Sequence, residues 1–533
     1  MVKNISKALQ QQNSLTGASV ILIVTLFLSN VLGVVRDHFL SQKIPTDLLS
    51  AYYAAFRIPD FIFNLLILGA IASAFIPVFT TLITQKKEKE AWQVASSIIN
   101  LAVMLLIVLI ILLFFLMPYL VPLIVPGFPL ERQDLTVKLA RIMLGSPLLF
   151  ALSYIFGGIL NSYKRFLAYA LAPLAYNLVI IIGTLFFADK YSVTGVAVVV
   201  VCGAALHFLI QLPVAIKLGF KYYLNIFWQH WGVRRIGVLM LPRAIALGSN
   251  QIMLLIFTAI ASGIGGASVA VYNLADNIQT MPMVVFGASF ATAIFPILSE
   301  AISANQKDRF AEQIERIIRV ILFFLIPMTV IFVLLRTEIV RLILGSGFFG
   351  WQQTVDTANT LGVFALALVF TGLMPLFSRA FYALHNTKIP MVVMIINVVI
   401  SIILAKIFSP HFGVVGLAMG FSIGAAISTV IIYLILRTKA NFKNEKQIVI
   451  FALKVILASF IMALAIQESK MLAGIFVDMQ RFWGVLAKTC ISLGIGISVY
   501  LLCCWIFGCE EIQAIKIIFN KMLHKGIDGT PVE

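Results

Sequence analysis

The chain has 533 residues, of which 61% are hydrophobic and 11% are charged, with a net charge of +17. A soluble domain carries about 25% charged residues, so this composition excludes an ordinary soluble protein. The net charge does not indicate a nucleic-acid partner, because the basic residues are spread over short loops between apolar runs. We expect an all-α polytopic membrane protein whose basic loops meet anionic membrane lipids.

Apolar runs of about twenty residues recur along the chain, which is the length that crosses a bilayer core of roughly 30 Å. Taking each run as one helix predicts about fourteen spans. Lys3 and Lys7 precede the first run, which we expect to be retained because no small-residue cleavage site follows it. The predicted spans cover residues 17–38, 56–83, 96–118, 138–160, 168–188, 194–216, 236–262, 270–298, 316–335, 358–384, 390–408, 413–436, 448–467 and 484–508.

Basic residues are concentrated in alternate connections between these spans. Together with both termini, one side of the membrane carries roughly 23 lysines and arginines, and the other side carries about 8. Because basic loops stay inside the cell, both termini are predicted to be cytoplasmic, which requires an even number of spans. The basic connections hold Lys86, Lys87, Lys89, Lys164, Arg165, Lys217, Lys221, Arg234, Arg235, Lys307, Arg309, Arg316, Arg319, Lys388, Arg437, Lys439, Lys443 and Lys446.

Four short motifs occur twice, about 220 residues apart each time. Two copies of one six-helix unit explain this spacing, and an even number of spans gives both copies the same orientation. We expect one lobe at residues 1–225, a second at 226–440, and two further helices with a cytoplasmic tail at 441–533. The paired motifs are Ser29-Asn30 with Ser249-Asn250, ASAFIP at 72–77 with ATAIFP at 291–296, LNSYK at 160–164 with LHNTK at 384–388, and the segments that begin at Gly195 and Gly416.

A stripe of small residues marks the second copy. Gly416, Gly420 and Gly424 follow one another at intervals of four, so they lie on one face of the predicted helix. In membrane proteins such a stripe lets another helix approach closely. We therefore interpret it as a packing surface rather than a substrate contact.

Motifs for catalysis are absent from the sequence. It contains no phosphate-binding P-loop, no zinc-protease motif and no nucleophile elbow. The five cysteines lie in or beside apolar runs, and the six histidines are scattered. We expect a protein that is not an enzyme and needs no metal or cofactor, with any transport driven by a gradient or the membrane potential.

Polar residues at membrane depth are the candidates for function. Two interpretations of the arginines remain open: they extend to the outer headgroups and pair locally with an aspartate, or they form a cationic cluster that binds an anion such as phosphate. The candidates are Arg36 and Asp37 at the end of span 1, Asn30 about two turns deeper, Arg57 and Asp60 at the start of span 2, and Asp276 and Asn277 at the start of span 8.

Five stretches in both lobes carry a family pattern. They read SNVLGVVRD at 29–37, AFRIPDFIFNLLILGAIASAFIPVF at 55–79, GGILNSYKRFLAYALAPLAYN at 157–177, YNLADNIQTMPMVVFGASFATAIFPILS at 272–299 and SRAFYALHNTKIP at 378–390. In these stretches the chain resembles the MurJ/MviN family of lipid II flippases, within the multidrug/oligosaccharidyl-lipid/polysaccharide exporter superfamily.

The resemblance implies a fold and a function. It implies fourteen helices, a central cavity for the pyrophosphate-sugar head of lipid II, and a groove between the last two helices for the lipid tail. The implied activity is ATP-independent flipping of this peptidoglycan precursor to the outer leaflet of the bacterial inner membrane, for cell-wall biogenesis and cell shape, by a monomer. The implied substrate-binding residues are Arg36, Arg57, Asn30, Asp276 and Asn277, and Asp37, Asp60 and Arg379 are implied structural or gating residues.

The chain departs from the family pattern at several charged positions, so its cavity is expected to be less basic. A flippase for another polyprenyl-linked sugar therefore remains an alternative, as does a cation-coupled drug exporter, although Asp37 and Asp60 stand too near helix ends to be good cation sites. A membrane scaffold without transport is a third alternative. Neutral residues replace charged ones at Asn30, Ser50, Phe63, Asn64, Leu68 and Asn277.

Reporter fusions test the predicted topology. Fusions after Gln85, Lys164, Lys307 and Asn441 should report a cytoplasmic position, and fusions after Pro129 and Gln352 an external one, because basic loops remain inside. Reversed signals at two or more of these sites would contradict the fourteen-span arrangement.

Overall fold

The structure is a computed structural model that describes residues 15–68, 75–476, 478 and 481–512. All regular secondary structure within these ranges is helical. The chain divides into two compact units. Unit 1 comprises Met1–Asn277, Ile343–Asp356 and Met394–Gly420, and unit 2 comprises Ile278–Leu342, Thr357–Val393 and Phe421–Glu533.

Unit 1 is built mainly from the first half of the chain. Its helices are α2 (Leu15–Lys43), α3 (Thr46–Ile62), the π-helix η2 (Phe63–Leu68), α4 (Ile76–Thr84), α5 (Glu88–Ile124), α6 (Leu130–Met143), α7 (Gly145–Ser162), α8 (Phe166–Leu209), α9 (Leu212–Lys217), α10 (Trp231–Ile264) and α11 (Ser268–Pro282), whose last turn belongs to unit 2. Within unit 1, α2 packs along α8 and α3 packs against α6 and α10.

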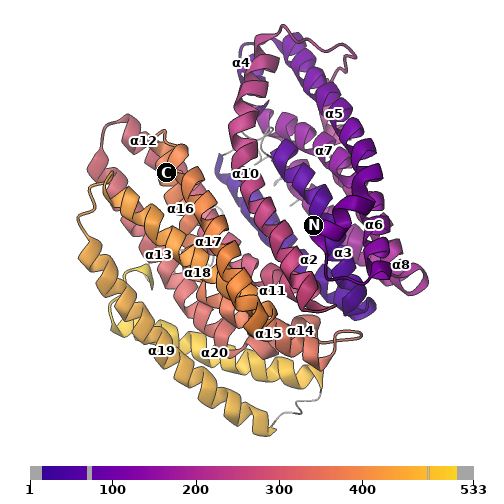
Figure 1. The fold of residues 1–533 in the computed structure, drawn as a ribbon. Coiled ribbons are helices and arrows are strands. Elements are labelled where there is room, and N and C mark those ends of the chain that lie inside the picture. Colours follow the sequence, from indigo (N-terminus) through magenta and orange to yellow (C-terminus); the bar gives the residue numbers. More distant parts are fainter. Residues whose placement is uncertain (1–14, 69–74, 477, 479–480, 513–533) are drawn as a thin grey trace, which may run out of the picture. The chain divides into compact units, whose positions relative to one another are not determined.

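Unit 2 contains most of the remaining helices. They are the π-helix η4 (Met283–Ala288), α12 (Ser289–Ser303), α13 (Lys307–Leu334), α14 (Arg336–Leu344), α15 (Trp351–Leu366), α16 (Leu368–Ala383), α17 (Lys388–Phe412), α18 (Val414–Arg437), α19 (Glu445–Phe476) and α20 (Phe482–Ile506); α14, α15, α17 and α18 cross the unit boundary. The last two helices pack on each other (Figure 1), and α19 also packs on α13. The Tyr500 hydroxyl donates to the Phe323 carbonyl at 2.7 Å and fixes α20 to α13.

Nine helical segments among the described residues are long and apolar enough to cross a membrane, or ten if one bent pair forms a span. One of the nine, Phe166–Lys217, has 52 residues and bends at Ser192, where φ is 50°. A straight helix of that length would reach about 78 Å, more than twice a bilayer core, so it is long enough for the two spans predicted at 168–188 and 194–216. The chain is a multi-pass membrane protein, and the count of fourteen stays a prediction.

Rare backbone conformations recur at the spacing of the sequence repeat. The two π-helices, η2 and η4, begin at Phe63 and Met283. π-Helices and non-glycine residues with positive φ are uncommon, so their pairing at one separation of about 220 residues is what two copies of one unit predict. The residues with positive φ that pair in this way are Lys86 with Asn305, Lys164 with His385, and Ser192 with Gly413.

Two glycines of the stripe on α18, Gly416 and Gly420, pack as the sequence predicts. A Cβ at Gly420 would lie 2.5 Å from the backbone nitrogen of Ala405 on α17, and a Cβ at Gly416 would lie 2.5 Å from the carbonyl carbon of Phe408. Because backbone atoms cannot move aside, α17 and α18 can approach this closely only through glycine.

Replacing Gly420 tests this contact. Gly420→Ala should lower the free energy of unfolding by about 1–3 kcal/mol through overpacking, measured by thermal unfolding of the purified protein in detergent. Gly494→Ala on α20 is the control, because nothing lies within 4 Å of its Cβ. That substitution should be neutral or stabilising, since alanine favours helix by about 1 kcal/mol. Equal destabilisation by both would contradict the packing role.

Candidate functional site

Arg36 and Asp37 form an ion pair on α2. The Nη2 and Nε atoms of Arg36 donate to Oδ1 of Asp37 at 2.8 and 3.0 Å, and the Asp37 side chain is only 4% exposed. The prediction that this pair ends its helix was wrong, because α2 continues for two further turns to Lys43. Hydropathy marks the end of an apolar run, whereas the helix continues here because its polar groups find partners inside unit 1.

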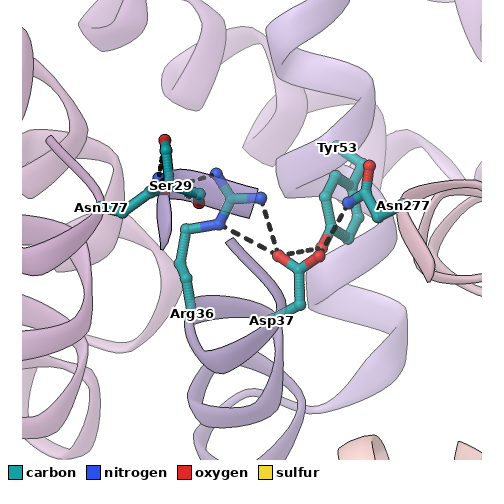
Figure 2. A network of polar contacts seen from close by, with 6 residues as sticks. All are labelled: Ser29, Arg36, Asp37, Tyr53, Asn177 and Asn277. Atoms are coloured by element: carbon teal, nitrogen blue, oxygen red, sulfur yellow. Dashed lines mark hydrogen bonds and ion pairs between the residues drawn. The ribbon is translucent and has the colours of Figure 1, made fainter. Parts of the chain in front are cut away.

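Tyr53 and Asn277 bring two further helices to Asp37. Figure 2 shows the carboxylate between the guanidinium of Arg36 and these two side chains. The Asn277 amide on α11 donates to Oδ2 at 2.8 Å, and the Tyr53 hydroxyl on α3 donates to Oδ1 at 3.4 Å. Both carboxylate oxygens are therefore hydrogen-bonded, as a buried charge requires.

Asn177 on α8 holds the other side of Arg36. Its side-chain oxygen accepts from Nη1 of Arg36 at 3.3 Å, and its amide nitrogen donates to the carbonyl of Ser29 at 3.2 Å (Figure 2). Arg36 thus points into unit 1 between α2 and α8. The arrangement shows the local pairing with Asp37 that the sequence allowed, and the position of Arg36 relative to the headgroups stays a prediction.

Arg57 is the second cation of the site. It lies three turns inside α3, not at the predicted start of a helix, and only 7% of its surface is exposed. Its Nε donates to Thr258 and its Nη2 to Asn273, both at 2.7 Å. These acceptors are neutral oxygens, and the nearby carboxylates of Asp60 and Asp276 act on the charge of Arg57 in addition to these contacts. The charge of Arg57 is therefore compensated less directly than that of Arg36.

Helical spacing joins the two arginines into one site. Tyr53 and Arg57 are one turn apart on α3, and Asn273 and Asn277 are one turn apart on α11. Each helix therefore supplies one side chain that contacts Asp37, which is Tyr53 or Asn277. The other two side chains, Arg57 and Asn273, contact each other. We call this connected set the polar seam; it consists of Arg36, Asp37, Tyr53, Arg57, Asn177, Thr258, Asn273 and Asn277.

The remaining predicted residues lie beside the polar seam or in the other unit. The amide of Asn30 donates to the carbonyl of Leu26 at 2.8 Å, within its own helix. Asp60 is partly buried three residues after Arg57, and Asp276 is partly buried next to Asn277. Arg379 is partly buried on α16 in unit 2.

Sequence reasoning missed four members of the polar seam, namely Tyr53, Asn177, Thr258 and Asn273. Two of them carried a usable signal, because Tyr53 and Asn273 stand one helical turn from a predicted site residue and on the same face. Asn177 and Thr258 carried none, since 141 and 201 residues separate them from the arginines that they contact. Only the tertiary fold brings these pairs together.

Comparison with models of known protein families identifies the family of this chain. The model of the family described as lipid II flippase MurJ matches residues 45–486. The chain belongs to the MurJ family. This family consists of transporters rather than enzymes, and its members are multi-pass proteins of the bacterial inner membrane.

Individual MurJ relatives are similar along most of their length. A probable lipid II flippase MurJ of Buchnera aphidicola is 27% identical over 440 residues, which cover 82% of this chain and 86% of that protein. The lipid II flippase MurJ of Burkholderia cenocepacia is 25% identical over 445 residues, with the same coverage of 82% and 86%.

Solved structures agree with this assignment. A lipid II flippase MurJ in an inward closed conformation is similar with a TM-score of 0.77 at 26% identity, covering 92% of this chain and 100% of that one. An inward-facing multidrug resistance MATE family transporter is similar with a TM-score of 0.69 at 16% identity, covering 79% and 98%. The second likeness concerns the fold alone.

Two aspartates allow a matched test of the polar seam. Asp37→Ala leaves Arg36 and two hydrogen-bond donors without their carboxylate, so we expect a loss of about 3 kcal/mol in the free energy of unfolding. Asp47→Ala removes a comparable 3.0 Å pair with Arg132, but Asp47 is 54% exposed, so the loss should be about 1 kcal/mol or less. Thermal unfolding of the purified variants measures both, and equal losses would show that the polar seam adds no special stability.

Proposed function

We propose that this protein flips lipid II, the lipid-linked peptidoglycan precursor, from the cytoplasmic to the outer leaflet of the bacterial inner membrane by alternating access. Membership of the MurJ family supports the substrate class. The main structural support for the proposal is the environment of Arg57. Its buried guanidinium donates to two neutral oxygens. Such a cation attracts an anion because these two contacts do not cancel its charge.

Arg57 is the expected main contact of the substrate pyrophosphate. Arginine suits phosphate because its planar donors can bind two oxygens at once. Thr258 and Asn273 hold two of its nitrogens and thereby fix the plane of the guanidinium. A cation that is held in place in this way loses little conformational freedom on binding.

Arg36 is the expected second contact, and its binding is coupled to Asp37. A phosphate at Arg36 has to share the guanidinium with Asp37 or replace it, because two of its nitrogens already donate to that carboxylate. Asn277 and Tyr53 can keep Asp37 hydrogen-bonded during the exchange. The ion pair thus provides a means of releasing the substrate after it has been bound.

The other predicted residues take supporting roles in this proposal. Asn30, Asp276 and Asn277 line the route of the headgroup, and Asp37, Asp60 and Arg379 act as structural or gating residues. The lobes at 1–225 and 226–440 alternate around the substrate, and 441–533 forms the additional segment. Both termini are cytoplasmic, and the protein works as a monomer without a nucleic-acid partner.

Growth rescue tests the proposal. The protein is produced in a bacterium depleted of its own lipid II flippase, and growth, precursor accumulation and membrane protein level are measured together. The unchanged chain should restore growth, whereas Arg57→Ala and Arg36→Ala should fail to do so. Lysine at either position should rescue only in part, because an ammonium keeps the charge but loses the planar set of donors.

Arg132→Ala is the matched control for these variants. Arg132 is 19% exposed and pairs with Asp47, much as Arg36 is 22% exposed and pairs with Asp37, but it lies outside the polar seam. This control should rescue normally. Full rescue by both seam alanine variants at normal protein level would remove the arginines from substrate binding, and failure of the unchanged chain would refute lipid II as the substrate.

A further inference from the structure

Unit 1 contains an apolar crevice of about 610 Å³ between α3 with η2, α5 and α10. Its walls are made only of aliphatic, phenylalanine and alanine side chains. The wall from α3 and η2 includes Ile58, Ile62 and Leu65, and the wall from α10 includes Leu255 and Ala259. In a membrane-spanning protein, such a surface is solvated by hydrocarbon rather than by water.

The crevice is long. Its wall on α5 runs from Leu109 to Ile124, a distance of about 22 Å along the helix axis. A single flexible hydrocarbon chain can lie along an apolar surface of this length.

One wall of the crevice is continuous with the site of Arg57. Ile58 directly follows Arg57 on α3, and Ala259 directly follows Thr258, the residue that accepts from Nε of Arg57. The same two helices therefore present a buried cation and an apolar slot side by side. A polyprenyl diphosphate has this combination of groups, since its anionic phosphate is joined directly to a hydrocarbon chain.

We propose that this crevice receives the phosphate-proximal part of the substrate's polyprenyl chain while the pyrophosphate is bound at Arg57. The proposal rests on the proposed function and adds a chain-binding site on unit 1. In the proposed topology, Leu109–Ile124 is the outer half of α5, so the chain is held on the side where the substrate leaves. Phospholipid tails lack a diphosphate at this position and should be retained less well.

Photo-crosslinking tests the occupant of the crevice. A crosslinking amino acid with a small alkyl diazirine side chain is placed at Leu113, which lines the crevice, or at its neighbour Leu112, which does not and is 51% exposed. The full-length protein is reconstituted in phosphatidylethanolamine and phosphatidylglycerol vesicles that contain lipid II. Mass spectrometry should find lipid II adducts at Leu113 at least five times more often than at Leu112. The Arg57→Ala background should abolish this preference.

Three crosslinking results would contradict the proposal or part of it. Equal lipid II yields at both positions, or phospholipid adducts alone at Leu113, would overturn the proposal. A preference that persists in the Arg57→Ala background would overturn the link to the bound pyrophosphate. Because the crosslinker itself perturbs little of the lining, this measurement also stands if bulkier variants fail to fold.

Filling the crevice tests its part in transport. Leu113→Trp should slow flipping at least tenfold, measured as lipid II accessible to a cleaving enzyme added outside the cells, at unchanged membrane protein level. Leu112→Trp should flip at the normal rate, because its side chain lies outside the crevice. Normal flipping by Leu113→Trp would refute the crevice proposal and leave the proposed function intact, whereas absence of flipping by the unchanged chain would refute the function itself.

Discussion

The carboxylate of Asp37 connects three helices of unit 1. It accepts hydrogen bonds from Arg36 on its own helix α2, from Tyr53 on α3 and from Asn277 on α11. In a bilayer no water is available to replace a lost partner, so each of these groups needs the others. The two contacts to Asp37 hold α3 and α11 against each other. Arg57 lies one helical turn from Tyr53 on α3, and in this arrangement it meets Asn273 of α11.

The two arginines consequently differ in how their charges are balanced. Arg36 is paired with Asp37 in direct contact, and Arg57 is held by neutral oxygens. In the proposed function, this difference assigns attraction of the anion to Arg57 and exchange of a carboxylate for the anion to Arg36.

The sequence was sufficient for the fold class, the family and the internal repeat, since these depend on apolar run length and on motifs read along the chain. Gly416 and Gly420 were predicted correctly as packing residues, because close helix packing requires small residues and these can be recognised in the sequence. The surroundings of Arg36 and Arg57 were not predictable, because their partners Asn177 and Thr258 come from distant helices. The positions of both arginines within their helices were missed as well. Hydropathy predicts where an apolar run begins and ends, whereas the hydrogen-bonded helices α2 and α3 extend beyond these runs.

Direct binding of lipid II tests the central claim that the buried guanidinium of Arg57 holds the substrate anion. The dissociation constant for lipid II is measured by native mass spectrometry on the purified protein, with Arg57→Gln compared with Arg132→Gln. Loss of a charge-assisted hydrogen bond corresponds to about 1.5–3 kcal/mol, so Arg57→Gln should bind at least about tenfold more weakly, and Arg132→Gln should bind as the unchanged protein does. Equal affinity of all three proteins would contradict the account.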